Sequence, residues 1–124
     1  MAEPVHVAVR GGDYTFLNLP DALAPGRTLF SFSNQGLVRH ELSIGLLRPG
    51  VTIDQVKKEG PPAGRFVERV AGILIARPGD SAGGQLLIDL APGRTYLVQC
   101  TLKDAPDAAP HSVLGMVGSF VVPK

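Results

Sequence analysis

The chain has 124 residues, of which 44% are hydrophobic and 19% are charged, as expected for one globular domain spanning residues 1–124. The net charge is only +1 and both signs are interspersed, so nucleic-acid binding through a basic surface is not expected. No apolar stretch reaches the ~18 residues that a membrane-spanning helix needs, so no transmembrane segment is expected either.

The first half of the chain predicts four strands. Val5, Val7 and Val9 alternate with more polar neighbours, which is the pattern of a half-buried strand. Phe30 and Phe32 fall on one face of another strand. The abundant glycine and proline mark turns between such segments. We expect these strands at residues 5–10, 14–19, 28–33 and 39–47.

One helix is predicted after the fourth strand. Thr52 suits its N-cap, Gln55 stands at the reciprocal capping position, and the Gly-Pro-Pro run at 60–62 ends it. Residues 65–76 are ambiguous, with a further helical turn leading into a strand at 72–76 as the expected arrangement.

Three more strands are predicted in the second half, at residues 86–90, 96–101 and 116–122, with loops at 77–84 and 103–110. Between the first two, Leu90 is followed by a Pro-Gly turn and then by Tyr96. This order resembles the tyrosine corner of Greek-key sandwiches, in which the phenol bonds back to the preceding turn. The fold class is therefore predicted as all-β, a Greek-key sandwich with one short helical insertion.

Side-chain parity places three chemically active residues on the core side of their strands. His40, Cys100 and Met116 each have the parity of the apolar residues in their own strand. His40 and Met116 begin their strands, whereas Cys100 ends its own. If the fourth and last strands run parallel to each other and antiparallel to the penultimate one, all three meet at one pole. His111, just before the last strand, would join them from the loop.

Two imidazoles, one thiolate and a weak thioether form the ligand set of a blue-copper electron-transfer centre. Taken singly, these residues have simpler explanations. A lone cysteine is often a small core residue, a methionine usually packs in the core, and a histidine in a proline-rich loop is usually a surface residue. The third histidine, His6, is expected to face solvent. We base the metal hypothesis on the four residues occurring together.

Residues 110–118, which read Pro-His-Ser-Val-Leu-Gly-Met-Val-Gly, resemble the copper loop of the plastocyanin and azurin type of cupredoxin. Other similar landmarks are Asn34-x-Gly36 ahead of His40 and Gly93-x-x-Tyr96 four residues before Cys100. The resemblance implies one type 1 copper ion, with His40, Cys100 and His111 as equatorial ligands and Met116 as the axial one. It also implies an electron carrier that is not an enzyme.

The resemblance further implies a monomer in the periplasm or outside the cell, with a leader peptide removed. A redox partner would dock near His111, where an apolar collar is expected from Leu37, Val38, Pro110 and Leu114. The neighbours of Cys100 are Gln99 and Thr101, whereas laccase-type oxidases have histidines there. A second copper centre is therefore not expected.

Three departures from the family pattern matter, one of which is an extra residue between Gly36 and His40. The loop at 101–110 between Cys100 and His111 is long, so a blue, green or otherwise distorted site is compatible with it. Glu41 stands where asparagine is usual, which puts the usual hydrogen bond across the site in doubt. Copper storage or delivery, and a metal-free domain that binds other proteins, remain alternatives to electron transfer.

Overall fold

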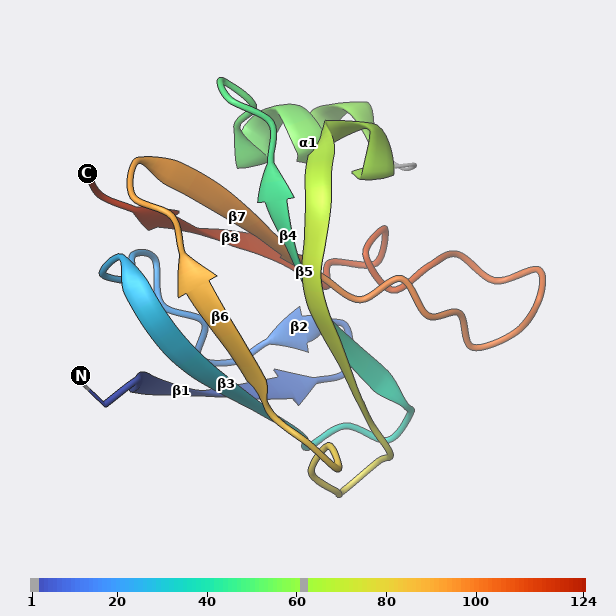
Figure 1. Ribbon diagram of the computed structural model, residues 1–124. Helices are drawn as coiled ribbons and strands as arrows, with labels where there is room; N and C mark the ends of the chain where they lie inside the picture. The colour runs from blue at the N-terminus through green and yellow to red at the C-terminus, as the bar shows by residue number, and fades with distance from the viewer. Residues whose placement is uncertain (1–2, 61–62) are drawn as a thin grey trace.

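A computed structural model describes residues 3–60 and 63–124 as two four-stranded sheets packed face to face (Figure 1). One sheet has the strand order β2-β1-β3-β6 and the other has the order β5-β4-β7-β8. The all-β sandwich with a short helix after the fourth strand is thereby confirmed. The elements are β1 (Val5–Gly12), β2 (Thr15–Phe16), β3 (Gly26–Asn34), β4 (His40–Leu47), α1 (Ile53–Glu59), the 3-10 turn η1 (Ala63–Phe66), β5 (Val67–Ala76), β6 (Leu86–Leu90), β7 (Arg94–Gln99) and β8 (Val117–Val122).

The second strand is much shorter than the predicted segment 14–19. β1 and β2 form a tight hairpin in which Gly12 pairs with Thr15, so residues 13 and 14 form its turn. Beyond β2 the Leu17 N–H still bonds the Arg10 carbonyl at 2.8 Å, and the side chain of Asn18 then takes the place of the backbone ladder. It accepts the N–H of Arg10 at 2.6 Å and donates to the carbonyl of Ala8 at 2.7 Å. The backbone therefore leaves the sheet while the segment stays attached to β1.

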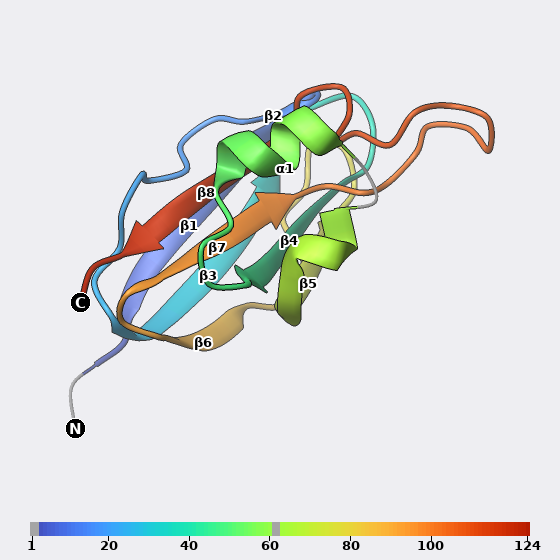
Figure 2. The ribbon, with the colours of Figure 1, turned by 90° about the horizontal axis from the view of Figure 1, so that it is seen from above.

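The helix begins and ends where its capping residues predict. The Thr52 hydroxyl accepts the N–H of Gln55 at 3.2 Å, and Gly60 closes the last turn with a φ of 68°. Residues 61 and 62, which were expected to terminate the helix, lie outside the described residues. Val56 of the helix packs with Phe66, Leu47 and Leu97 over the outer face of the second sheet. Figure 2 shows α1 lying across that sheet.

β5 begins at Val67, five residues before the predicted strand at 72–76. Only the 3-10 turn that ends at Phe66 corresponds to the expected helical turn. The strand pairs with β4 along its whole length, with register shifts at Ile44/Gly45 and Leu46/Leu47. These irregularities explain why residues 67–71 lack a clear period-two pattern.

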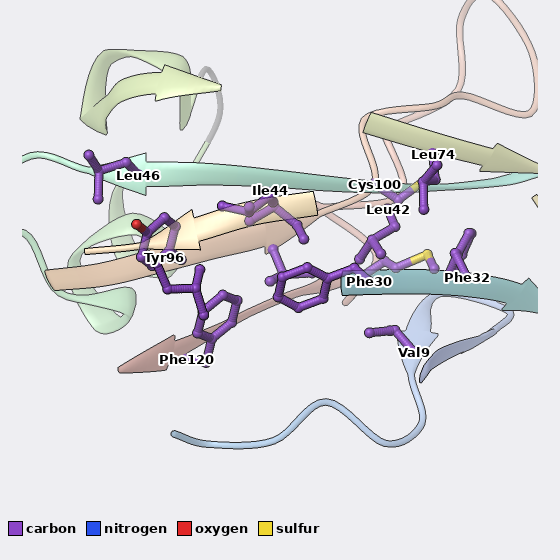
Figure 3. Close-up of a cluster of buried hydrophobic side chains, with 14 of the residues drawn as sticks. Val9, Phe30, Phe32, Leu42, Ile44, Leu46, Leu74, Tyr96, Cys100 and Phe120 are labelled. Atoms are coloured by element: carbon purple, nitrogen blue, oxygen red, sulfur yellow. The ribbon is translucent and has the colours of Figure 1, made fainter. Parts of the chain in front are cut away.

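The main core fills the space between the sheets. Figure 3 shows it extending from Tyr96 and Leu46 at one end to Cys100 at the other. The Tyr96 hydroxyl accepts the N–H of Ala91 at 2.9 Å, which confirms the tyrosine corner. Its ring stacks on Phe120 with centroids 5.2 Å apart. The corner therefore fixes the core at the end away from Cys100.

β7 runs antiparallel to both β4 and β8, so β4 and β8 run in the same direction, as predicted. The starts of β4 and β8 and the end of β7 consequently lie at one pole. β7 ends one residue before Cys100, and β8 begins one residue after Met116, so both strands are slightly offset from the predicted ranges. Among the described residues, neither helical segment has the length and apolar character required to cross a bilayer.

Candidate metal centre

Three predicted ligands meet at this pole. His40 is the first residue of β4, Cys100 directly follows β7, and His111 lies in the loop before β8. All three are fully buried, and one donor atom from each lies within 4.8 Å of the other two. The Nδ1 atoms of His40 and His111 are 3.2 Å apart, and the Cys100 Sγ is 3.4 Å from Nδ1 of His111. The convergence predicted from strand parity is therefore present.

The loop before His40 is held by a buried asparagine. The Asn34 amide donates to the carbonyls of Val38 at 2.8 Å and Ala76 at 3.0 Å. Its oxygen accepts the N–H of Gly36 at 2.8 Å. Because one side chain satisfies three backbone groups, the segment between β3 and β4 has a fixed path into His40.

Glu41 forms a hydrogen bond across the site that the sequence had left in doubt. Its backbone N–H donates to the Cys100 Sγ at 3.3 Å. Its carboxylate accepts both the N–H and the hydroxyl of Thr101, each at 2.9 Å. Glu41 is only 6% exposed, so these bonds replace most of its contact with water. A carboxylate thus connects β4 to the residue after Cys100.

Met116 is fully buried and connected to the other residues through its backbone. Its carbonyl accepts the Cys100 N–H at 3.1 Å, and its N–H donates to the carbonyl of His111 at 3.0 Å. Its side chain belongs to the same core cluster as Cys100. Its methyl group lies 3.2 Å from the point that a Cβ on Gly11 would occupy, beside the Phe32 ring. The absence of a side chain at Gly11 leaves this space to the thioether.

The outer edges of both imidazoles are covered by carboxylates. The Nε2 of His40 lies 2.8 Å from the Asp13 Oδ1, and the Nε2 of His111 lies 2.7 Å from the Asp104 Oδ1. The Tyr14 hydroxyl donates to the other oxygen of Asp104 at 2.6 Å. The hydrogen bond with His40 lowers the pKa of Asp13, and the bonds with Tyr14 and then His111 lower the pKa of Asp104. Both carboxyls are therefore ionised at neutral pH.

No sequence pattern marks Asp13 or Tyr14 as site residues, and Asp104 lies in the predicted loop at 103–110. The β1–β2 turn that carries the first two comes from a part of the chain far from every predicted ligand. An acidic residue in the turn between two strands is an ordinary turn former, so local pattern could not single it out.

These contacts orient both rings. An ionised carboxylate only accepts, so each imidazole donates its Nε2–H outward. The two Nδ1 atoms then face inward, 3.2 Å apart, and the Cys100 sulfur lies 3.4 Å from the Nδ1 of His111. A histidine whose outer N–H is held by a carboxylate is the usual form of a metal-binding histidine. The donor set therefore fits a metal ion bound through both Nδ1 atoms.

The thiol completes this set as a soft ligand. Burial raises the pKa of Cys100, and the nearby charges of Glu41 and Asp104 raise it further, against backbone hydrogen bonds that lower it. The sulfur is therefore a thiol in the metal-free protein, and cation binding releases its proton. Two imidazoles and one thiolate are ligands that suit copper.

No protein-family model matches the sequence, and no curated protein matches it either. Similar solved structures do exist. Reduced auracyanin from Roseiflexus castenholzii matches with a TM-score of 0.64 at 20% identity, over 99% of this chain and 100% of that one. Auracyanin B matches with a TM-score of 0.64 at 23% identity, over 100% and 93% of the two chains. Reduced rusticyanin matches with a TM-score of 0.52 at 17% identity, over 98% and 78%. At these identities the likeness concerns the fold.

Proposed function

From the cupredoxin fold that the chain shares with the auracyanins and rusticyanin, we propose a one-electron carrier with a single copper ion. The proposed ligands are His40, Cys100, His111 and Met116. The observation that carries the proposal is the meeting of two imidazole Nδ1 atoms and one thiol, all fully buried, at one pole. The core spans both sheets, which supports treating residues 1–124 as one functional domain.

The bound ion would supply reversible one-electron exchange between Cu(II) and Cu(I). The protein holds the donor atoms in place and excludes water from them. His40 and Cys100 stand at the ends of paired strands, and hydrogen bonds through Met116 and Leu102 fix the backbone around His111. A rigid, dry donor set changes little between oxidation states, which keeps the cost of rearrangement small. The Met116 thioether would supply a fourth, weaker donor to the ion.

A role as an enzyme is not proposed. The third histidine, His6, is exposed on β1 and takes no part in the cluster. The three clustered residues are all fully buried, so they offer a substrate no direct access. Electron exchange requires no such access.

We propose that a partner protein docks over the apolar collar near His111. Leu37 is 86% exposed and Leu114 is 48% exposed, while Val38 and Pro110 are partly buried beside them. The His111 side chain itself is only 1% exposed, because Asp104 covers its edge. The electron would therefore cross the hydrogen bond between His111 and Asp104 rather than leave from a bare imidazole. A monomer in the periplasm or outside the cell is proposed on the family resemblance.

The test is the visible spectrum of the protein after addition of Cu(II), for the wild type and for Cys100→Ser. We expect an intense thiolate-to-copper absorption in the wild type and its loss in the variant. His6→Ala is the matched control, because this histidine lies outside the cluster, and it should keep the band. Equal spectra for wild type and Cys100→Ser would overturn the proposal. Voltammetry separates the alternatives, since a storage or delivery protein would bind Cu(I) tightly without reversible oxidation.

A further inference from the structure

Three residues close the pole over the two histidines: Asp13 and Tyr14 of the β1–β2 turn, and Asp104 of the loop after Cys100. We call them the cap. We propose that the cap orients both imidazoles and biases the site toward Cu(II), so that the reduction potential is set low. The inference rests on the copper site proposed above and assigns a positioning role to residues outside the ligand set.

The first support is that each histidine has its own carboxylate. Asp13 accepts from His40 at 2.8 Å and Asp104 accepts from His111 at 2.7 Å. Their side chains are 31% and 35% exposed, whereas the imidazoles are essentially buried. Each carboxylate is therefore partly shielded from water and acts on its ring at hydrogen-bond distance. The two carboxylates come from different loops, so each histidine is oriented independently of the other.

The second support is backbone strain in the turn. Tyr14 has a φ of 62°, and among the described residues no other non-glycine residue has a positive φ. A bulky side chain is rarely found in this region, and such a conformation persists only where surrounding contacts enforce it. The contacts here are the hydroxyl bond to Asp104 and an edge-on packing against His111, with ring centroids 5.0 Å apart. The turn conformation and these two contacts together place the ring over the site.

The third support is that the turn is anchored to the other loops of the pole. The Asp13 carboxylate also accepts the N–H of Leu37, at 3.0 Å from each oxygen. The Tyr14 carbonyl lies 3.0 Å from the point that a Cβ on Gly115 would occupy, so the loop before β8 can approach because residue 115 is glycine. Figure 2 shows these loops gathered at the same end of the molecule. The cap thus connects three separate segments around the donors.

The charge of the cap determines its effect. A carboxylate that accepts the Nε2–H makes the Nδ1 of the same ring a stronger donor. Two such carboxylates stabilise a doubly charged ion more than a singly charged one, because each interaction grows with the charge of the ion. The buried Glu41 carboxylate acts in the same direction. Neutralising a cap carboxylate should therefore weaken Cu(II) binding more than Cu(I) binding.

The experiment compares Asp13→Asn, Asp104→Asn and the control Asp107→Asn, an exposed residue of the same loop. The amide keeps the shape and the accepting oxygen but removes the charge. We expect Cu(II) affinity to fall about 10-fold or more in each cap variant. Cu(I) affinity should fall less, so the reduction potential rises in both, whereas Asp107→Asn keeps the wild-type value. Unchanged potentials in both cap variants would overturn the inference.

A second measurement needs no copper and separates the two proposals. Ring ¹⁵N spectra of the metal-free protein report which nitrogen of each histidine carries the proton. We expect Nε2–H on both His40 and His111 in the wild type, and loss of this preference at His40 in Asp13→Ala and at His111 in Asp104→Ala. A wild-type preference for Nδ1–H would overturn the cap. A confirmed cap in a protein without a copper–thiolate band would instead overturn the proposed function.

Discussion

Single side chains around the pole combine a local and a long-range role. Glu41 directly follows the proposed ligand His40 and connects it to Cys100. Its N–H donates to the Cys100 sulfur, and its carboxylate accepts from Thr101. Asp104 likewise receives one bond from His111 and one from Tyr14. Each carboxylate accepts more than one hydrogen bond, and these bonds compensate part of its charge.

The Tyr14 phenol offers a direct readout of this network. Its hydrogen bond to Asp104 raises its pKa above the ordinary value, because the neutral phenol donates to an ionised carboxylate. This contribution to stability is complete below the unfolded-state pKa and is lost as pH rises through the higher folded-state pKa. We expect Asp104→Asn to lower the pKa, as followed by phenolate absorbance in an alkaline titration. Tyr14→Phe identifies the transition, and an unchanged midpoint in Asp104→Asn would contradict the prediction.

At this scale the sequence predicted the donors better than their surroundings. Parity alone placed His40, Cys100 and Met116 inside, since a strand alternates its faces whatever the rest of the fold does. It could not predict Asp13 against His40, because that contact depends on how the first hairpin lies over a loop from the next strands. Glu41 appeared to be a departure from the family, yet the structure gives it a bond across the site.

Strands and turns differ in how well their sequence predicts them. β4, β6 and the capped helix α1 lie close to their expected bounds, since their patterns reflect burial and capping within the element. β2 is short because a side chain, that of Asn18, takes over the pairing. β5 is long because its partner β4 supports it through two register shifts. The bounds of β2 and β5 differ from the predicted ones because of contacts with neighbouring elements. A local sequence pattern carries no information about those contacts.

The turn before β4 provides a test of how closely these elements approach. A Cβ on Gly36 would overlap the Asp13 carboxylate and lie 2.9 Å from the Nε2 of His40. Gly36→Ala should therefore push Asp13 away and lower the free energy of unfolding by roughly 1–3 kcal/mol. Urea unfolding of the metal-free protein measures this change.

Gly83→Ala is the matched control, because nothing lies within 4 Å of a Cβ there. Its unfolding free energy should stay within about 0.5 kcal/mol of the wild type. Equal unfolding free energies for the two alanine variants would contradict the prediction, because they would mean that the turn accommodates the added methyl group without displacing Asp13 from His40.

For the whole molecule, the core extends far beyond the site, although Cys100 and Met116 belong to both. The apolar cluster extends through both sheets, and Tyr96 fixes the end away from the pole. The protein should therefore fold without metal and become more stable when copper binds. A ligand at about 100 times its dissociation constant adds roughly 2.7 kcal/mol to the free energy of unfolding.

Thermal unfolding with and without Cu(II) checks this expectation. The midpoint should rise for the wild type and for His6→Ala, and the rise should be much smaller for Cys100→Ser. An equal rise in all three proteins would indicate binding elsewhere on the surface.

The long loop between Cys100 and His111 projects from the body in Figure 1. Its neck is closed by the His111 N–H, which bonds the Leu102 carbonyl at 2.8 Å, so the ligand spacing is set below the tip. Length in this segment is thereby decoupled from the geometry of the donors. Residues 105–109 could be trimmed or exchanged for a foreign peptide, provided that Asp104 is kept. The tip of this loop is therefore a site where the protein can be modified without altering the positions of the donor atoms.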